Sequence, residues 1–435
     1  MNFSKTQIIL LGAGVLIVTL IVLLLVGVIP GLRQKGAVDG PTGQITVWGV
    51  YDSERTISDT LIAPFVTANP NAQITYRQMD PRTYEQDLIN ALAAGTGPDV
   101  FYVKNSWLTK HADKLWPLPA ENFSLATTKQ LFPDVVIQDF TIGSSMYALP
   151  LYVDTLALFY NKAIFDNAGI AEPPRTWEDF TELIPKLRII DATGQLTRAA
   201  AAIGGSGRNI NSATDLLNLI MLQNGTAMTD QGFTRATFAG SGANAASFYT
   251  DFSNPRSKNY TWDSSSHYSL DAFAEENVAM IFNYAYLVPQ LRQKNPFLNF
   301  GIAPMLQYKN AARQINYPNY FGLGISATSK QKDLALAFIT NSTMDAATNI
   351  GYLNATGRPP ASRQTVAISM ADPEIAIFSR QVLTAMDWPK IDDEAIDTSF
   401  TKMLELVNSG QLPLARALKQ TEEEITALIQ RRLQP

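Results

Sequence analysis

The sequence predicts an α/β protein with two lobes that follows a single N-terminal membrane-spanning helix. Its 435 residues exceed what one hydrophobic core usually organises, which predicts two lobes or domains. Strand-like runs alternate with amphipathic helical patterns. Strands joined by helices of this length form right-handed crossovers in mainly parallel sheets. Ahead of these elements, the stretch Ile8–Ile29 contains no charged residue.

The uncharged stretch predicts a membrane anchor. At about 1.5 Å per helical residue it can cross a hydrocarbon core of about 30 Å. It is longer than the apolar region of about 7–15 residues in a cleaved signal, which is the alternative. The basic residues on its two sides nearly balance, so charge leaves its orientation undecided. The expected segments are a cytoplasmic N-terminus at 1–7, the anchor at 8–30 and a flexible linker at 31–43.

The first part of the globular chain is expected to form strand, helix, strand, helix and strand. Apolar residues keep one helical face between Ile57 and Val66, and again between Tyr84 and Leu92. The second of these helices is expected to stop at the turn sequence GTGP, residues 95–98. The three strands are expected at Gln44–Trp48, Gln73–Tyr76 and Asp99–Val103.

The rest of the chain continues the alternation. An apolar stripe predicts a helix over residues 177–187, capped by Thr176 and kinked or broken at Pro185. A second amphipathic pattern predicts a C-terminal helix over residues 412–433. Short strands are expected at Ala157–Tyr160, Val278–Phe282, Phe300–Ala303 and Tyr320–Ser326.

Composition excludes several kinds of chemistry. The chain has no cysteine, which removes disulfides, thiolate nucleophiles, Cys-ligated zinc and a lipid-attachment Cys. Its two histidines, His111 and His267, have no second His at metal-binding spacing, so we expect no metal site and no cofactor. A net charge of −5 without a long basic run argues against a nucleic-acid partner.

Polar and aromatic residues follow three of the expected strands. In open α/β sheets, ligands bind beyond the C-terminal ends of the strands. Sugars need such surfaces, because aromatic rings stack on C–H faces while carboxylates and amides pair with hydroxyls. The residues at these places are Tyr51 and Asp52, Asn105 and Trp107, and Asn283, Tyr284 and Tyr286.

Five segments in order resemble a known family. ITVWGVYDSE resembles its opening strand and turn, and ALAAGTGPDVFYV resembles its most recognisable motif. MYALPLYVDTLALFYNKAIFDNAGIAEPPRTWEDF is similar to the segment in which the chain crosses between lobes. VAMIFNYAYLVPQL and YFGLGISATSKQKDLALAFI are similar to the later ligand strand and the return crossing. The family is that of the extracellular solute-binding proteins of ABC importers, in particular the maltose-binding-protein-like sugar binders (family 1).

The resemblance implies a type II periplasmic-binding-protein-like fold. Two α/β lobes, each a mainly parallel sheet flanked by helices, are joined by hinge strands and close over a solute in the cleft. The implied lobes are residues 44–152 with 326–362 and residues 153–325 with 363–435. Together with the strand-end residues, the expected ligand-binding set is Trp48, Tyr51, Asp52, Tyr102, Asn105, Trp107, Tyr152, Asp154, Asn283, Tyr284, Tyr286, Tyr320 and Trp388.

The implied function is capture of a small solute, in particular a sugar or oligosaccharide, for delivery to ABC transporter permease subunits. The protein is expected to be a monomer, anchored in the cell membrane by one span with its globular part outside the cytoplasm. No catalytic residue is expected.

Two alternative functions remain open at this stage. A membrane-tethered carbohydrate-active hydrolase would use Asp52 and Asp154 as its carboxylate pair. A carbohydrate sensor or adhesin would keep the fold without transport. The sequence GGSGR at residues 204–208 lacks the ending of a P-loop, and no Gly-x-Ser-x-Gly elbow supports a serine hydrolase.

Overall fold

The computed structural model describes residues 40–263 and 265–433. The predicted N-terminus at 1–7 and anchor at 8–30 lie outside these residues, as does most of the predicted linker. Within the described part of the chain, no helix combines the length and the apolar character needed to span a membrane.

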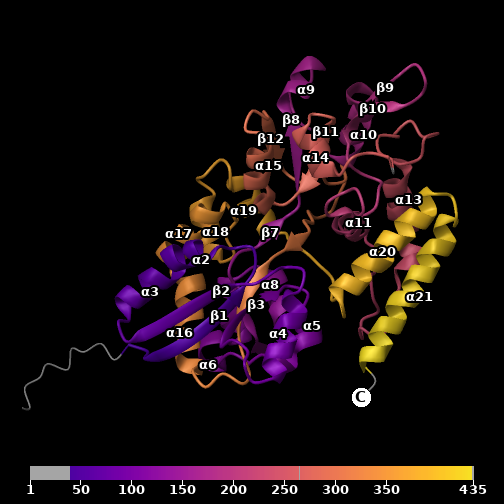
Figure 1. Cartoon of the computed structure of the whole chain (residues 1–435). Coiled ribbons are helices and arrows are strands. Elements are labelled where there is room, and N and C mark those ends of the chain that lie inside the picture. Colours follow the sequence, from indigo (N-terminus) through magenta and orange to yellow (C-terminus); the bar gives the residue numbers. More distant parts are fainter. Residues whose placement is uncertain (1–39, 264, 434–435) are drawn as a thin grey trace, which may run out of the picture.

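Two lobes are each built on a five-stranded sheet, and they lie one above the other in Figure 1. The first sheet has the order β2-β1-β3-β14-β6 and the second has the order β12-β8-β11-β10-β9. The strands of the first sheet are β1 Gly43–Gly49, β2 Ala72–Gln78, β3 Val100–Lys104, β6 Ala148–Pro150 and β14 Phe321–Ile325. Those of the second are β8 Ala157–Asn161, β9 Ile189–Ile190, β10 Leu196–Ala201, β11 Val278–Asn283 and β12 Phe300–Ala303.

Both sheets are mixed rather than mainly parallel. In the first sheet β1 pairs in parallel with β2 and β3, whereas β14 is antiparallel to its neighbours β3 and β6. In the second sheet β10 and β11 are parallel, and β8 is antiparallel to β11 and β12. The reversed strands β8 and β14 both follow a crossing between the lobes. Each of these two strands starts at the edge of its sheet that borders the cleft, which is where the parallel strands of that sheet end. Each therefore runs antiparallel to its neighbours.

A short antiparallel pair forms the hinge between the lobes. It joins β7 (Asp154–Thr155) to β13 (Pro318–Asn319). Helix α19 (Ala376–Val382) braces this pair, because the Gln381 amide donates to Thr155 Oγ1 (2.8 Å) and to the carbonyl oxygen of Leu156 (2.9 Å).

Helices cover the first sheet and extend its lobe beyond the expected ranges. Strand β14 belongs to the first sheet, although residues 153–325 were expected in the second lobe. Helix α18 (Arg363–Ser369), expected in the second lobe, packs on α7 (Leu125–Leu131) and α17 (Ala346–Thr356) of the first. The helices are α2 Glu54–Ile57, α3 Ala63–Ala68, α4 Tyr84–Ala93, α5 Leu108–His111, α6 Ala120–Phe123, α7 Leu125–Leu131, α8 Asp134–Phe140, α16 Lys332–Met344, α17 Ala346–Thr356 and α18 Arg363–Ser369; a π-helical turn, η1 Ser58–Ile62, joins α2 to α3.

Helix α10 (Trp177–Leu187) shows how sequence sets a helix in the second lobe. Thr176 caps it by accepting a hydrogen bond from the backbone N–H of Asp179 (3.1 Å). Pro185 does not break the helix, which ends two residues later at Leu187, because a proline in the last turn has few residues left to disrupt.

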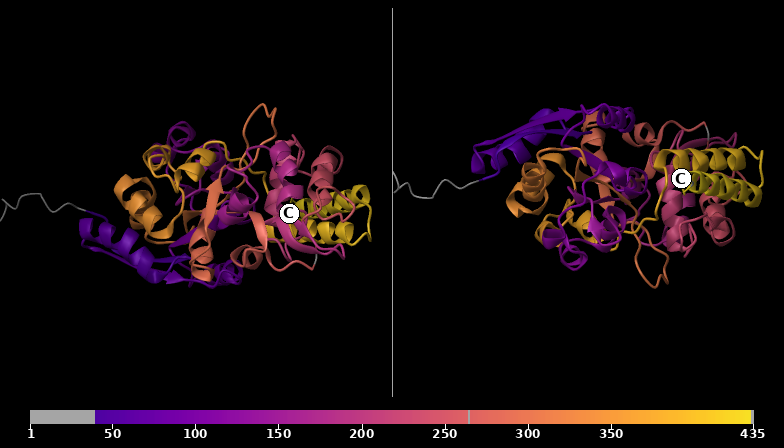
Figure 2. Two further views of the ribbon diagram at one scale, coloured as in Figure 1. Left: turned by 90° about the horizontal axis from the view of Figure 1, so that it is seen from above. Right: turned by 90° about the horizontal axis from the view of Figure 1, so that it is seen from below.

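The remaining helices complete the second lobe, and α20 and α21 run side by side along it (Figure 2). They are α9 Lys162–Asn167, α11 Ala213–Gln223, α12 Phe238–Ser241, α13 Ala243–Asp251, α14 Ser269–Ala274, α15 Val288–Lys294, α20 Asp393–Asn408 and α21 Leu414–Leu433. Each lobe buries its own hydrophobic core, one around Phe101 and Phe338 and the other around Trp177 and Tyr249.

Candidate functional site

A cleft of about 200 Å³ lies between the two lobes beside the hinge. It sits at the edge where β1, β3 and β6 end and where β14 begins, as the strand-end rule predicts. The first lobe and hinge supply Val50, Tyr51, Pro81, Arg82, Tyr84, Glu85, Lys104, Trp107, Tyr152, Asn319, Phe321 and Arg358. The second lobe supplies Tyr286, Asp393 and Glu394.

Two tyrosines from opposite lobes stack across this cleft. The rings of Tyr51 and Tyr286 have their centroids 6.3 Å apart at an interplanar angle of 29°. Tyr286 also stacks on Tyr284, at 5.9 Å and 16°. Tyr51 has a φ of 67°, in the left-handed region that a bulky residue rarely adopts, and its side chain is 55% exposed. A strained and exposed aromatic residue in a cleft indicates a functional constraint on its position.

A second aromatic group forms the first-lobe wall of the cleft. Trp107 stacks on Tyr84 with the centroids 5.6 Å apart at 26° and meets Phe321 edge-on at 6.5 Å. The hydroxyl of Tyr84 donates to the carbonyl oxygen of Tyr102 at 2.9 Å. The helix α4 that carries Tyr84 is therefore tied to the end of β3, and this contact fixes the ring at the cleft.

A buried ion pair lies behind the first-lobe wall. The Arg358 Nη2 is 2.9 Å from Asp52 Oδ1, and both side chains are nearly inaccessible. The hydroxyls of Tyr102 (3.0 Å) and Tyr352 (2.9 Å) donate to Asp52 Oδ2. Burial, and then the charge of Asp52, raises the pKa of Tyr102 well above its usual value, so it remains a donor. The guanidinium of Arg358 lies 4.3 Å from the ring centroid of Tyr152, and both residues line the cleft.

Asp154 links the hinge to the loop that carries Tyr286. It is fully buried and accepts hydrogen bonds from the backbone N–H groups of Thr155 (2.9 Å), Ala285 (3.0 Å) and Tyr286 (3.0 Å). Burial raises the pKa of Asp154 to about 7, against the opposing effect of these hydrogen bonds. Asp154 does not line the cleft, and its contacts instead hold the Tyr286 loop in place.

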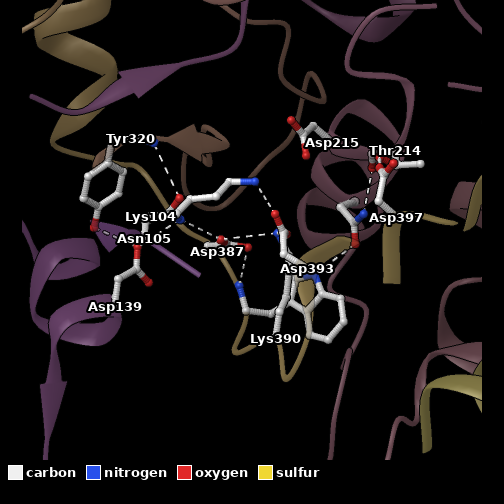
Figure 3. Close-up of polar contacts among 12 residues, drawn as sticks. Lys104, Asn105, Asp139, Thr214, Asp215, Tyr320, Asp387, Lys390, Asp393 and Asp397 are labelled. Atoms are coloured by element: carbon white, nitrogen blue, oxygen red, sulfur yellow. Dashed lines mark hydrogen bonds and ion pairs between the residues drawn. The ribbon is translucent and has the colours of Figure 1, made fainter. Parts of the chain in front are cut away.

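Ion pairs connect the two lobes at one end of the cleft (Figure 3). Lys104, at the end of β3, pairs with Asp393 at the start of α20. Lys390 Nζ lies 3.1 Å from the same carboxylate. Burial alone would raise the pKa of Asp393, but Lys104 and Lys390 lower it well below its usual value. Asp393 is therefore ionised at neutral pH and lies between two cations.

The side-chain amide of Asn105 makes a further contact between the two lobes, outside the cleft. The Asn105 Nδ2 donates to Asp387 Oδ2 of the second lobe at 3.1 Å and to Asp139 Oδ2 at 3.3 Å (Figure 3). The hydroxyl of Tyr320 donates to Asp139 at 2.8 Å. Burial raises the pKa of both carboxyl groups. The charge of Asp387 raises the pKa of Asp139 further, whereas Lys390 opposes the effect of burial on Asp387. Asn105 and Tyr320 thus serve the junction between the lobes rather than the cleft.

Four of the thirteen residues predicted to bind ligand line the cleft. They are Tyr51, Trp107, Tyr152 and Tyr286. The other nine predicted residues do not line the cleft. Five of them have been described above, namely Asp52, Tyr102, Asn105, Asp154 and Tyr320. The remaining four are Trp48, Asn283, Tyr284 and Trp388.

Those four residues have other partners. Trp48 lies under the guanidinium of Arg77, 5.5 Å from its ring centroid. The Asn283 Oδ1 accepts from Asn211, the Tyr284 hydroxyl donates to Asp215 and the Trp388 Nε1 donates to Asn218, at 2.6, 2.7 and 2.9 Å. All four side chains therefore contact other residues of the protein outside the cleft.

The sequence analysis missed all six charged residues of the cleft. Arg82 lies in the turn before α4 and Glu85 lies in the first turn of that helix, whereas Tyr84 was interpreted as part of an apolar helical stripe. Phe321 was interpreted as a strand residue. Arg358, Asp393 and Glu394 come from segments far along the chain, so no local signal placed them here. The others missed are Val50, Pro81, Lys104 and Asn319.

Both histidines and the carboxyl groups of Asp52 and Asp154 have partners within the protein. Over residues 40–263 and 265–433, no group of three or more His, Asp or Glu side chains could hold a metal ion. His111 Nε2 lies 2.7 Å from Glu85, and His267 Nδ1 lies 3.4 Å from Glu275. Asp52 is paired with Arg358 and Asp154 accepts from backbone amides, and neither lines the cleft. A general acid and a nucleophile would both have to face the substrate.

Residues 52–348 match the sequence model of a family described as bacterial extracellular solute-binding protein. Two relatives match at lower coverage. A maltotriose-binding protein of Pyrococcus abyssi is 26% identical over 146 residues, which are 33% of this chain and 31% of the relative. The diacetylchitobiose binding protein DasA of Streptomyces coelicolor is 26% identical over 155 residues, 34% of this chain and 35% of the relative. These matches span about a third of each relative's length.

The fold is also that of solved structures. The sugar-binding protein MalE from Xanthomonas citri superposes with a TM-score of 0.76 at 20% sequence identity, covering 90% of this chain and 98% of that one. The two-lobed type II periplasmic-binding-protein fold is therefore confirmed.

Proposed function

Since this chain belongs to the bacterial extracellular solute-binding protein family, we propose that it captures a sugar or short oligosaccharide in the interlobe cleft and delivers it to the permease of an ABC transporter. The observation that carries the proposal is the stacked pair of Tyr51 and Tyr286, one from each lobe. Aromatic faces of this kind suit the apolar C–H face of a sugar ring. The names of the relatives that bind maltotriose and diacetylchitobiose support the same ligand class.

The charges of the cleft support a neutral solute. Three cationic side chains, Arg82, Lys104 and Arg358, and three carboxylates, Glu85, Asp393 and Glu394, line the cleft. A cleft for an anionic or cationic solute would carry an excess of the opposite charge. Balanced charges with many donors and acceptors suit hydroxyl groups, which donate and accept.

Closure of the lobes would couple capture to delivery. A solute shifts the population towards the closed form only if it binds that form better, and here it would contact both lobes. Tyr286, Asp393 and Glu394 supply the second-lobe contacts. The permease would then recognise the closed form.

We also propose that residues 8–30 anchor the protein, with the lobes outside the cytoplasm. The support is the uncharged stretch Ile8–Ile29, together with the absence of a lipid-attachment Cys from the sequence.

A thermal-shift experiment on the full chain in detergent tests the capture proposal. Maltose, maltotriose and diacetylchitobiose are added in turn, with amino acids and short peptides as the comparison. A ligand at 100 times its Kd stabilises the native state by about 2.7 kcal/mol, so a sugar that binds raises Tm. A rise with amino acids or peptides alone would reject a sugar as the solute and keep the binding fold. No rise with any solute would reject capture.

Hydrolysis is not favoured, because this is a family of binding proteins and neither Asp52 nor Asp154 lines the cleft. Chromatography of the same sugars after incubation would detect shorter products if the chain were a hydrolase.

A further inference from the structure

A second hollow lies next to the cleft. It is an open groove of about 590 Å³ between the start of α20, the end of α21 and the first-lobe residue Lys110. Its lining includes Lys110, Asp392, Thr398, Glu424 and Arg431. Of the described residues that line the groove, none is aromatic, whereas the cleft has six aromatic side chains.

A thin wall of ion pairs separates the groove from the cleft. Lys110 Nζ lies 2.7 Å from Glu85 Oε1 and 2.8 Å from Asp392 Oδ2. Glu85 lines the cleft, whereas Lys110 and Asp392 line the groove. The Lys104–Asp393 pair stands beside this bridge on the cleft side, and Glu394 borders both hollows.

The wall that separates the two hollows also joins the two lobes. Lys104, Lys110 and Glu85 belong to the first lobe, and Asp392 and Asp393 belong to the second. The Lys110 side chain is 27% exposed and that of Asp392 is 30% exposed, so water screens their attraction less than it screens a fully exposed pair. Breaking the bridge would therefore loosen the lobes at this end and connect the cleft to the groove.

We infer that the ion pairs of Lys104 and Lys110 form a gate that restricts the bound saccharide to short chains by closing the cleft off from the α20–α21 groove. The inference rests on the proposed function. With the gate closed, the cleft of about 200 Å³ is smaller than the roughly 300–1,000 Å³ typical of ligand pockets. The stacking surfaces all lie on the cleft side, so a short saccharide gains most of its contact there. A longer chain must either break the ion pairs or leave its additional units outside.

Titration calorimetry on the full chain in detergent tests the gate. The probes are glucose, maltose, maltotriose and maltohexaose, and the N-acetylglucosamine series of the same lengths. We expect wild type to bind the hexasaccharide at least tenfold more weakly than its best short saccharide. Lys110→Met should reduce that ratio to below threefold. The control is Lys294→Met, which removes a 2.5 Å ion pair with Asp271 inside the second lobe and should leave the ratio unchanged.

Distances between spin labels give a readout that needs no ligand. The sequence has no cysteine, so exposed Asn90 in the first lobe and exposed Ala415 in the second can each be replaced by a labelled cysteine. In the ligand-free protein, Lys110→Met should lengthen and broaden the distance distribution, and Lys294→Met should not.

The outcomes separate the two proposals. If no saccharide binds, the proposed function fails, and the spin-label distances still decide whether Lys110 holds the lobes together. If saccharides bind but wild type and Lys110→Met show the same length ratio, the gate is rejected and the proposed function stands. An unchanged distance distribution in Lys110→Met rejects the gate as well.

Discussion

Tyr51 and Tyr286 each contribute one ring to the stacked pair that spans the cleft. Tyr51 is exposed and Tyr286 is half-buried, and the two rings meet only because the lobes face each other. Tyr51 holds its place in a left-handed backbone conformation, whereas Tyr286 is held by the hydrogen bond from its N–H to Asp154.

Tyr286→Ala should weaken sugar binding while leaving the fold intact. A stacking partner contributes about 0.5–1.5 kcal/mol beyond its buried area, which is roughly 2- to 12-fold in Kd. Calorimetry with the best sugar measures the change. Tyr308→Ala, which removes a half-buried tyrosine of the same lobe away from the cleft, should leave the affinity unchanged. An unaltered affinity in Tyr286→Ala would mean that the ring only packs.

Because the pKa of Asp154 is raised, its contribution to the free energy of unfolding should fall as pH rises. Its pKa is about 7 in the folded protein and about 3.9 in an unfolded chain, so the folded form retains the proton between these values. The free energy of unfolding therefore falls as pH rises from about 4 to about 7, by up to about 4 kcal/mol from this group. Urea unfolding of wild type and Asp154→Asn between pH 4 and 8 measures this. The stability difference between the two proteins should change across the window, and parallel curves would rule the effect out.

The Asp52–Arg358 pair should matter for stability more than for specificity. Arg358→Met leaves a buried carboxylate without its cation, which costs about 3–5 kcal/mol in comparable cases. Asp52→Asn combined with Arg358→Met removes both charges and should cost less than the single change. Urea unfolding at pH 7 compares the three proteins. A double variant less stable than Arg358→Met would show that charge burial is not the cause.

Individual helices and strands depend on contacts that are readable in part from local sequence. Asp99 of the GTGPD motif accepts from the backbone N–H of Thr46 (2.9 Å) and from Ser329 (2.7 Å). One carboxylate thereby connects β1 with the segment after β14. Helix α4 stops just before Gly95, whose φ of 72° suits a glycine.

The cap of α10 gives a quantitative check on local sequence effects. Thr176→Ala removes the acceptor for the N–H of Asp179 and should lower the free energy of unfolding by about 1 kcal/mol. Thr181→Ala, on the same helix, is the matched control, because its hydroxyl only bonds back to the carbonyl oxygen of Glu178. Urea unfolding that shows equal losses for both variants would indicate that the cap contributes nothing specific.

For the whole molecule, the predicted membrane anchor has a direct test. The full chain should remain in the membrane pellet after alkaline carbonate washing, and a variant lacking residues 8–30 should not. The mass of the mature protein is the second measurement, since the anchor requires an uncleaved N-terminus. A mature chain that begins near residue 37 would show that the stretch is a signal.

The sequence by itself determined the order of the elements, the family and the edge of the sheets at which the cleft forms. Periodicity predicts elements because a side chain's burial follows the local geometry of a helix or strand. The strand-end rule then placed Tyr51, Trp107 and Tyr286 at the cleft. Membership of the solute-binding family confirms the resemblance carried by the five ordered motifs.

Only the tertiary structure decided which polar side chains face the cleft. Asp52 lies where a ligand contact was expected, yet it pairs with Arg358 some 306 positions along the chain. Lys104 meets Asp393 across 289 positions. The tertiary structure also shows that β8 and β14 run antiparallel to their neighbours, where mainly parallel sheets were expected, and that α18 packs on helices of the first lobe. Local sequence specifies the kind of side chain and its face, but a charged group's partner depends on which distant segment the fold brings beside it.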